Sequence, residues 1–398
     1  MASNIYTKIK PLFRFTGNLW FILILFSVLI ITASVIKYFE GPKVMSGVLT
    51  THYNNFLTFK YSFFHLIENK DLYLYYPQNH WDLFKYSPAF AVFMGFYAYL
   101  PEILGLILWN LTNFIPLFFA IKLLPGIKIE LKAFLLWFIL IELMTSIQNA
   151  QSNGLTLALM LFGFVFLEKK NPLWASFFLV LSVLIKIFGV VAFAIVIFYP
   201  DKLKFILWSL MWIIVFLFIP LIFVNIDQLI FIYKSWFKLL TTDYSESIGL
   251  SVMGWLRTWF GLNPGNNIII LVGSILLIVP LIKYKKWNEI TFRLLYFALI
   301  LIWVIIFNHK AESPTFVIAM CGIGIWYFTQ EKKPLNFLLI ILAFILTSLS
   351  PTDLFPPYIR EHLIKPFVLK AIPAIFICVL LYYQLVFGKY KKNNSVIL

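Results

Sequence analysis

The sequence predicts an all-α protein, a polytopic integral membrane protein, from three observations. Of its 398 residues, 62% belong to the hydrophobic set and 12% are charged. Its mean hydropathy is +0.90. A soluble domain is about half apolar and about a quarter charged, because charged side chains must cover its surface. Apolar runs of helical length also recur from end to end, so residues 1–398 are treated as a single membrane domain.

The apolar runs predict about 10–13 transmembrane helices, because a span needs about 20 mainly apolar residues and several runs are shorter. They are Leu19–Ile36, Ser87–Leu100, Ile103–Ile121, Ala133–Thr145, Gly154–Leu167, Leu173–Tyr199, Phe205–Val224, Ile268–Ile282, Phe292–Phe307, Thr315–Phe328, Phe337–Leu349 and Val368–Phe387. The first run follows Lys8, Lys10 and Arg14 and precedes no small-residue cleavage site. It is therefore expected to be an uncleaved anchor whose N-terminus is cytoplasmic.

The net charge of +15 is not expected to indicate nucleic-acid binding, because the basic residues form short clusters between apolar runs. This pattern is typical of the positive-inside bias and of contact with anionic lipid head groups. Clusters at 202–204, 283–286, 332–333 and 389–392 are predicted to be cytoplasmic. Simple alternation of spans then places the lysines at 122–132 and 169–170 outside, against this bias. The conflict disappears if Ser87–Leu100 is re-entrant and Leu173–Tyr199 is two short helices that break near Lys186. Both topologies remain open.

The loop at 38–86 is predicted to lie on the outer side and to hold an interfacial amphipathic helix. Phe56, Phe59 and Phe63 recur at helical spacing within Tyr53–Ile67, and Asn54 and Asn55 stand where N-caps are expected. All five histidines fall in loops assigned to this side. The chemistry is therefore expected on the outer (exoplasmic or periplasmic) face of the cell membrane.

The motifs of soluble enzymes are absent from the sequence. It contains no P-loop, no GxGxxG after a strand, no HExxH, no GxSxG and no CxxC. Its two cysteines, Cys321 and Cys378, lie inside apolar runs, which argues against a disulfide framework or a cysteine metal site. We expect no cofactor and no metal site.

Two ionisable residues interrupt apolar runs, where each costs about 2.5–3.5 kcal/mol on insertion scales. Lys186 lies in VLIKIFG and is interpreted as a cation that holds a lipid phosphate; a lysine that snorkels from a helix end is the alternative. Glu142 lies in FILIELM. It either pairs with a lysine or lines the site.

Three polar segments are candidates for substrate contacts. The run QNAQSNG offers the amides of Gln148, Asn149, Gln151 and Asn153, which bind sugar hydroxyls or phosphate oxygens without adding charge, although a turn with an N-cap has the same composition. The outer loops at 242–257 and 308–314 contribute Arg257, His309, Lys310 and Glu312. The cluster HWDLFKYSP contributes His80, Asp82, Lys85 and Tyr86. The basic residues suit phosphate, although solvated loop charges need no such role.

Several of these segments, in this order, resemble glycosyltransferase family 87 of the GT-C superfamily, whose members include α-1,2-mannosyltransferases. The matching stretches are ENKDLY, FKYSPAF with the exit Leu100-Pro101, Trp109-Asn110, QNAQSNGL, VLIKIFG, SIGLSVMGWLR and NHKAESPTF. The resemblance implies a GT-C-like fold and transfer of a hexose, such as mannose, from a polyprenyl-phosphate-linked donor. The implied acceptor is a glycolipid or glycan.

The resemblance also implies an aspartate shortly after the first membrane helix as catalytic base. In this chain that position holds Asn55, whose amide cannot accept a proton at neutral pH. Asp82 is the first choice for the base, followed by Glu68 and Glu312. Lys186 and Arg257 are the expected phosphate partners. A transporter or flippase of lipid-linked sugars, or a non-catalytic relative, is the alternative function.

Overall fold

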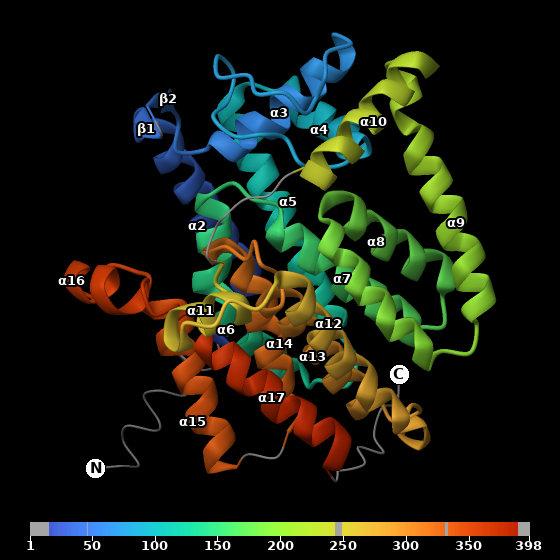
Figure 1. Ribbon diagram of the computed structural model, residues 1–398, viewed down its shortest axis with the longest axis vertical. Helices are drawn as coiled ribbons and strands as arrows, with labels where there is room; N and C mark the ends of the chain where they lie inside the picture. Colours follow the sequence, from blue (N-terminus) through green and yellow to red (C-terminus); the bar gives the residue numbers. More distant parts are fainter. Residues whose placement is uncertain (1–15, 46, 243–248, 331–332, 389–398) are drawn as a thin grey trace.

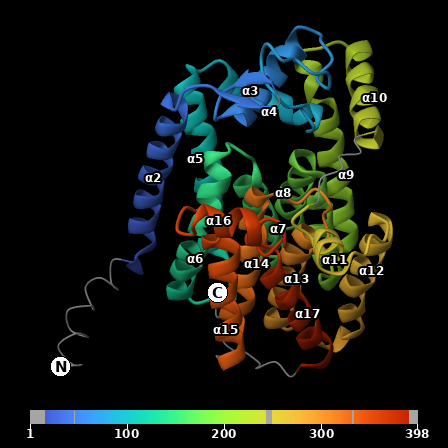
Figure 2. The same cartoon turned by 60° about the vertical axis from the view of Figure 1, so that its left-hand side comes forward.

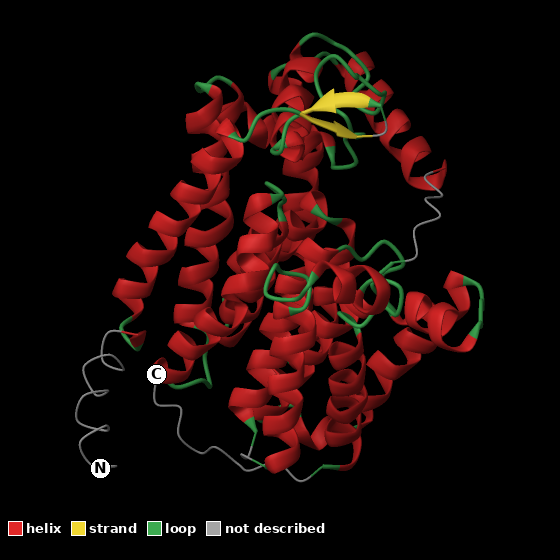
Figure 3. Ribbon diagram, turned by 90° about the vertical axis from the view of Figure 1, so that its left-hand side faces the viewer, coloured by secondary structure: helices red, strands yellow, loops and turns green. Residues whose placement is uncertain are grey.

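The computed structural model describes residues 16–45, 47–242, 249–330 and 333–388. Within these ranges the chain is helical apart from connecting segments and one antiparallel hairpin, β1 (Lys43–Met45) and β2 (Val48–Thr50), which Figure 3 shows among the helices. Three helices are long and apolar enough to cross a membrane: Leu19–Phe39, Glu102–Leu123 and Lys202–Ile222. Shorter apolar helices accompany them, as a polytopic membrane protein requires.

The helices form a bundle with a smaller layer across one end (Figures 1 and 2). The end layer contains the hairpin, α3 (Asn54–Ile67) and α4 (Pro88–Ala98), and α10 (Ile226–Thr242) returns over it from α9 (Lys202–Phe218). The other elements are α2 (Leu19–Phe39), α5 (Glu102–Leu123), α6 (Ile129–Gln148), α7 (Asn153–Glu168), α8 (Pro172–Ile185), η1 (Ile187–Phe198), η2 (Ile219–Ile222), α11 (Val252–Phe260), α12 (Asn266–Ile278), η3 (Val279–Ile282), η4 (Tyr284–Lys286), α13 (Ile290–Ile306), η5 (Ser313–Thr315), α14 (Phe316–Thr329), α15 (Pro334–Ala343), η6 (Phe344–Leu349), α16 (Pro357–Ile359), η7 (Arg360–Ile364) and α17 (Ile372–Phe387).

Each predicted apolar run contains a helix, but two of the runs are not single long helices. The run Ser87–Leu100 gives α4 with 11 residues, about half the length that a span needs. The run Leu173–Tyr199 divides at Lys186, whose backbone is extended (φ −138°, ψ 116°) between α8 and η1. Gly189 lies against Ser182, where a Cβ atom would come 2.7 Å from the serine hydroxyl, so the chain turns back on itself. The structure therefore has the break near Lys186 that one of the two open topologies requires.

This hairpin brings the basic loops together at one end of the bundle. Arg293 pairs with Glu168 there, with its NH2 group 2.8 Å from Oε2, and the hydroxyl of Tyr199 also donates to Glu168. The amine of Lys132 donates to the carbonyl of Lys122 (2.8 Å), and a Cβ atom on Gly126, in the loop after α5, would come 2.5 Å from the side chain of Leu294 in α13. The loops after α5, α7 and η1 therefore lie with the loop before α13, and the structure favours the second of the two topologies.

The helix predicted at 53–67 is present as α3, but its environment differs from the prediction. Phe56, Phe59 and Phe63 are buried against protein, not lipid: Phe59 packs edge-on against Phe90 of α4 and Trp109 of α5. The N-cap assignments are wrong, because Tyr53 holds that position without a side-chain cap. The side-chain oxygen of Asn54 instead accepts from the backbone of Trp81, at 2.7 Å, and secures the following loop.

Glu142 pairs with a lysine that the sequence reading did not consider. The amine of Lys370, just before α17, lies 2.7 and 2.9 Å from the two carboxylate oxygens of Glu142, and both side chains are buried. A buried charge without its counter-ion is strongly destabilising, so this pair fastens the C-terminal helix to α6. Glu142 therefore has a structural partner, and the first of its two interpretations is confirmed.

Candidate functional site

The site is built around the amide-rich turn between α6 and α7. Ala150 adopts a left-handed conformation (φ 49°), and its carbonyl accepts from the indole of Trp109, at 2.8 Å. The side-chain oxygen of Asn113 accepts from the backbone of Leu155, at 3.0 Å. Gly154 permits this approach, because a Cβ atom there would come 2.4 Å from the Asn113 carbonyl. Contacts with helix α5 thus hold the turn in place.

A chain of hydrogen bonds runs from this turn to both neighbouring segments. The Lys186 amine donates to the side-chain oxygen of Asn153 (2.7 Å), and the Asn153 amide donates to Gln151 (2.8 Å). The Gln151 amide then donates to the carboxylate of Glu312 (3.0 Å). We call Lys186, Asn153, Gln151 and Glu312 the polar chain. It places a cation and an anion at opposite ends of two amides, and its Glu312 end is exposed.

Lys186 reaches the turn because the backbone breaks at that residue. Helix α8 ends at Ile185, and the carbonyl of Leu184 accepts from the backbone of Ser87 in the FKYSP segment, at 3.3 Å. The tip of the α8–η1 hairpin therefore contacts both the amide turn and the start of α4. An isolated lysine among apolar residues is costly, and the amide oxygen of Asn153 offsets part of that cost.

The FKYSP segment contributes Tyr86, and Asp82 lies close by. The hydroxyl of Ser152 donates to that of Tyr86 at 3.4 Å, which joins this segment to the amide turn. Burial raises the pKa of Tyr86, and the carboxylates of Glu312 and Asp82 raise it further by their charge. The hydroxyl of Tyr86 is therefore protonated at physiological pH, and the charges of both carboxylates act on it. The loop before α4 and the loop before α14 therefore both lie near Tyr86.

His80 supports the loop that carries Asp82. Its Nδ1–H donates to the backbone carbonyl of Asp82 at 2.6 Å, and its ring is buried. Burial lowers the pKa of His80 to about 4, partly offset by this hydrogen bond. The imidazole is therefore neutral at physiological pH. The backbone of Leu83 donates to Asp82 Oδ1 at 2.7 Å, which helps to orient the carboxylate.

Asn55, at the start of α3, lies at the same turn. Its amide donates to the backbone carbonyl of Asn149 at 2.8 Å. Gln148 and Asn149 are exposed beside it at the end of α6. Asn55 is thus part of the site, at the position where the family resemblance implies a catalytic aspartate. Its side chain donates a hydrogen bond to the backbone and cannot act as a base.

The segment at 308–312 is positioned by the loop before α11. The backbone of Leu250 donates to the carbonyl of Ala311 at 2.9 Å, and a Cβ atom on Gly249 would come 2.2 Å from the carbonyl of His309. The side chain of Asn308 accepts from the backbone of Lys310 at 3.0 Å. His309, Lys310 and Glu312 therefore belong to one ordered turn next to the polar chain.

Two sequence candidates are not brought into this arrangement. Glu68 follows the far end of α3, about 20 Å along the helix from Asn55, and pairs with Lys70 at 2.6 Å. Arg257 is exposed on α11, and no hydrogen bond or ion pair among the described residues connects it to the polar chain. Lys85 is next to the site through its backbone, which accepts from Trp236 at 3.4 Å. Residues 243–248 of the outer loop lie outside the described residues.

The sequence reading missed Ser152, Ser87 and Lys370. The two serines were hidden in motifs that were valued for their amides and aromatic rings. Lys370 stands five residues after Lys365 at the start of an apolar run, where a lysine is expected to reach water rather than a buried carboxylate.

Comparison with known proteins identifies the family of the chain. A family model described as Glycosyltransferase family 87 matches residues 84–351, more than half of the chain. The matched segment includes the FKYSP segment and the whole polar chain, whereas Asn55, Glu68, His80 and Asp82 precede it. No curated protein matches the chain. The chain belongs to glycosyltransferase family 87 and is a membrane glycosyltransferase.

Proposed function

We propose that the protein transfers a hexose, such as mannose, from a polyprenyl-phosphate-linked donor to a hydroxyl group of a glycolipid or glycan acceptor. The observation that carries this proposal is the polar chain. It gathers a lysine, two amides and a carboxylate from α8–η1, the amide turn and the loop before α14, among helices that are otherwise apolar. An amphiphilic donor needs such a group of polar side chains at the end of apolar helices.

Lys186 is proposed to bind the phosphate of the donor. As the sugar leaves, the phosphate diester becomes a monoester and gains negative charge, so a cation placed there stabilises the transition state more than the ground state. The interaction with Asn153 holds the amine in place beforehand. Arg257 or Lys310 would add a second cation once donor is bound.

The remaining polar groups are proposed to bind the sugar and the acceptor. Gln148, Asn149, Gln151 and Asn153 present amides, and Tyr86, His80, His309 and Lys85 are proposed to contribute further contacts. Asp82 is the proposed base: it takes the proton of the acceptor hydroxyl as the oxygen attacks the anomeric carbon, and the lipid phosphate departs. Glu312 is joined through two amides to Lys186, which suits a carboxylate that orients groups.

The proposed site is on the outer face of the membrane. The basic loops lie at the end of the bundle near Arg293 and Lys132, and the amide turn of the polar chain contacts Asn55 of α3 in the end layer. Positively charged loops favour the cytoplasmic side, so the opposite end is outside. The cations of the site serve the leaving group, and we propose that the reaction needs no metal or other cofactor.

The experiment that tests this proposal uses the purified protein in phospholipid vesicles with polyprenyl-phosphate [³H]mannose and a panel of glycolipid acceptors. We expect release of polyprenyl phosphate together with an equal amount of labelled acceptor. Movement of the intact labelled lipid between leaflets, without cleavage of the glycosidic bond, would contradict the proposal and indicate a flippase. Binding of the donor without either event would indicate a non-catalytic relative.

A further inference from the structure

The lipid-facing helices of the bundle differ in length. The stretches Leu19–Phe39 (α2) and Lys202–Ile222 (α9 with η2) have 21 residues each, or about 31 Å along the axis, and only a minority of their residues is buried. The hydrocarbon core of a bilayer is about 30 Å thick. These two stretches therefore match a membrane of ordinary thickness.

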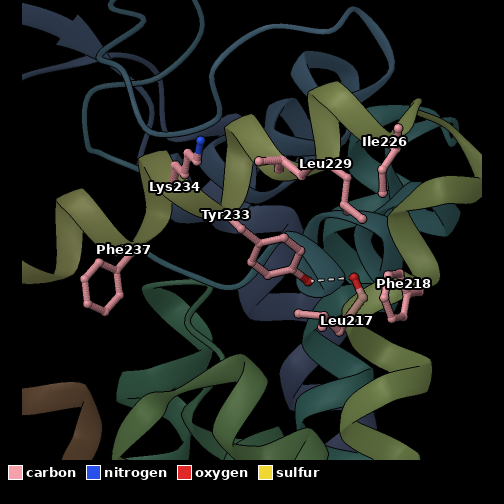
Figure 4. A pocket seen from close by; sticks show the side chains of 8 residues that line it. Leu217, Phe218, Ile226, Leu229, Tyr233, Lys234 and Phe237 are labelled. Atoms are coloured by element: carbon pink, nitrogen blue, oxygen red, sulfur yellow. Dashed lines mark hydrogen bonds between the residues drawn. The ribbon is translucent and has the colours of Figure 1, made fainter.

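On the side of α9 the apolar surface extends as far as the junction with α10. Phe218 and Ile226 are about half exposed there, and the hydroxyl of Tyr233 donates to the carbonyl of Leu217 at 3.0 Å, so it presents no unsatisfied polar group (Figure 4). The sequence from Phe205 to Ile226 contains no charged residue. Hydrocarbon can therefore cover this side along the whole of α9.

The helices α15 with η6 and α17 form a shorter part of the bundle, and they pack against each other (Figure 2). The continuous helices α15 and η6 have ten and six residues, and α17 has 16. Each stretch therefore rises about 24 Å, which is about 6 Å less than an ordinary hydrocarbon core. Phe337 and Val379 are more than half exposed on these helices, so this side also faces lipid.

Contacts with α6 show at which end of the bundle these helices fall short. The ring of Phe344 in η6 stacks on that of Phe138 in α6, with centroids 6.0 Å apart. The two residues lie ten and nine positions after the starts of α15 and α6, so both helices begin at about the same level. Phe138 precedes the end of α6 by ten positions, whereas Phe344 precedes the end of η6 by five, so η6 ends about 8 Å short of the amide turn. The buried pair of Lys370 and Glu142 agrees, because α17 begins beside the middle of α6 and not beside its end.

The segment that joins these two helices, residues 350–367, is charged and exposed. Asp353 pairs with Arg360, and Glu361 pairs with Lys365. The side chain of Asp353 is 95% exposed, and those of Glu361 and Lys365 are more than half exposed. Exposed charges of this kind are strongly unfavourable in hydrocarbon. The segment therefore requires water or lipid head groups at the level where η6 and α17 end.

Aromatic side chains mark the same level. Trp259 and Phe260 of α11 and Tyr358 of α16 are about half exposed or more. The indole of Trp259 donates to the carbonyl of Phe367 at 2.7 Å, which joins α11 to the charged segment. Figure 1 shows α11 and α16 near the same ends of α15 and α17. Tryptophan and tyrosine favour the boundary between hydrocarbon and head groups, so this arrangement is typical of a membrane interface.

We propose that the protein thins the phospholipid bilayer beside α15 and α17, so that head groups of the leaflet on the amide-turn side contact α11 and residues 350–367. The hydrocarbon there is about 6 Å thinner than in an ordinary bilayer, whereas the bilayer beside α2 and α9 keeps its thickness. The interaction surface is thus a polar and aromatic ledge below the level of the amide turn. Its partner is the lowered head-group layer.

The ledge lies next to a loop of the candidate site. The backbone of Leu250, two residues before α11, donates to the carbonyl of Ala311 at 2.9 Å, and the next residue, Glu312, is exposed. With the leaflet lowered on this side, the Glu312 carboxylate faces water and head groups and not hydrocarbon. The use of this access for a lipid-phosphate substrate rests on the proposed function, but the deformation of the bilayer does not.

Spin labels at two matched positions test the difference in thickness. Phe218→Cys on α9 and Tyr358→Cys on α16 replace side chains that are 46% and 72% exposed, and each position lies about 24 Å or more from the basic end of its helices. The native Cys321 and Cys378 are buried, and the unsubstituted chain is the labelling control. In nanodiscs of dioleoyl phosphatidylcholine, electron paramagnetic resonance compares collisions with oxygen, which concentrates in hydrocarbon, and with a water-soluble nickel chelate. We expect mainly oxygen collisions for Phe218→Cys and mainly nickel collisions for Tyr358→Cys. Equal depths of the two labels would overturn the proposal.

Two pairs of charge variants test what sets the level of the ledge. Glu361→Leu with Lys365→Leu removes one exposed ion pair, and the label at Tyr358→Cys should then move several ångströms deeper, with a higher ratio of oxygen to nickel collisions. Asp201→Leu with Lys204→Leu removes a pair of the same kind at the basic end of α9 and should leave this ratio unchanged. An unchanged ratio in both variants would contradict the proposal, because the charges of the ledge would then not hold the head groups.

The thickness of the lipid gives an independent measurement on the wild type. Thinning a bilayer costs more free energy as its acyl chains lengthen. We therefore expect the Tm to fall from dimyristoleoyl to dierucoyl phosphatidylcholine vesicles, and a Tm that rises in this series would contradict the proposal. No donor or acceptor is present in these experiments. Absence of hexose transfer would therefore refute only the proposed function, whereas equal label depths would refute only the thinning.

Discussion

At the scale of single residues, the candidate site depends on side chains that satisfy one another before any substrate arrives. Lys186, Asn153, Gln151 and Glu312 each have a partner in the polar chain. Such preorganisation reduces the rearrangement needed when charge develops on the leaving phosphate. The loop that carries Asp82 is fixed through the backbone by His80, and the charge of Asp82 acts on Tyr86 beside the amide turn. Asp82 is the proposed base because its carboxylate can accept a proton, whereas the amide of Asn55 cannot.

The assignment of the base predicts a difference between two carboxylate variants. Asp82→Asn should lower kcat for hexose transfer by about 10²–10⁴, the usual contribution of a general base, with donor affinity unchanged. Glu312→Gln should lower kcat less, because an amide can still bond to Gln151. Asp201→Asn, at the basic end of the bundle, is the control. A larger loss in Glu312→Gln than in Asp82→Asn would transfer the role of base to Glu312.

The burial of His80 predicts how stability responds to acid. The pKa of His80 in the folded protein is about 4, below its ordinary value of 6.5. As the pH falls, His80 is therefore protonated in the unfolded chain before it is protonated in the folded protein. The stability that neutral His80 contributes is therefore present above about pH 6.5 and is lost as pH falls toward 4. His80→Gln should flatten the fall of Tm over this window, measured in detergent by intrinsic fluorescence. An equally steep fall in the variant would show that other groups cause it.

At the scale of elements, breaks in regular structure place the functional groups. The backbone break at Lys186 turns one long apolar run into a hairpin with a polar tip. The left-handed Ala150 and the close approach of Gly154 to α5 form the amide turn. A membrane interior favours unbroken helices, so these breaks are stable only where side chains and neighbouring backbone satisfy the freed polar groups.

The close packing of α7 on α5 predicts that Gly154 tolerates no side chain. In Gly154→Ala the new Cβ atom would lie 2.4 Å from the carbonyl of Asn113, which is backbone and cannot rotate away. The free energy of unfolding should fall by about 1–3 kcal/mol, as for overpacked cores, and transfer activity should fall because the amide turn moves. Gly265→Ala is the control, since nothing lies within 4 Å of its Cβ position. Equal Tm values for the two variants would contradict this packing.

How far the sequence predicts this structure differs between elements. The apolar runs predicted the helices, because helices of this kind depend on local composition. The break near Lys186 belonged to one of two open topologies, which the distribution of the lysines suggested and only the structure could separate. The apolar face of α3 was predicted correctly from its spacing, but its partner was not. Spacing shows that a face is apolar and does not distinguish lipid from the aromatic rings of α4 and α5.

Parts of the site could not be predicted, because they depend on contacts between distant residues. Gln151 and Glu312 are 161 positions apart, and Glu142 and Lys370 are 228 apart. Composition marked all but Lys370 as candidates, yet it could not pair them. It ranked Asp82 before Glu68 but could not show that Glu68 follows the far end of α3 and pairs with Lys70.

At the scale of the whole molecule, a buried ion pair connects the C-terminal helix α17 to the rest of the bundle. Lys370 and Glu142 are buried and pair with each other, and the carbonyl of Lys370 accepts from Thr347 in η6 at 2.8 Å. The matched family segment ends before Lys370. The pair therefore joins the last helix to the part of the chain that carries the polar chain.

This pair predicts an asymmetry between single and double variants. Lys370→Met should destabilise the protein by about 3–5 kcal/mol, because Glu142 is left as an uncompensated buried charge. The double variant Glu142→Met with Lys370→Met should recover most of this loss, because apolar replacements of similar volume remove the unpaired charge. Thermal unfolding in nanodiscs measures both. Additive losses would show that the two charges act independently.

We propose that Lys186 stabilises the departing lipid phosphate at the end of an otherwise apolar bundle. Single-turnover transfer from polyprenyl-phosphate mannose tests it most directly, in the wild type, in Lys186→Met and in Lys170→Met, an exposed lysine at the basic end. We predict a rate about 10²–10³ lower in Lys186→Met, the loss typical of removing one group that stabilises developing charge, and no change in Lys170→Met. A wild-type rate in Lys186→Met would contradict the account.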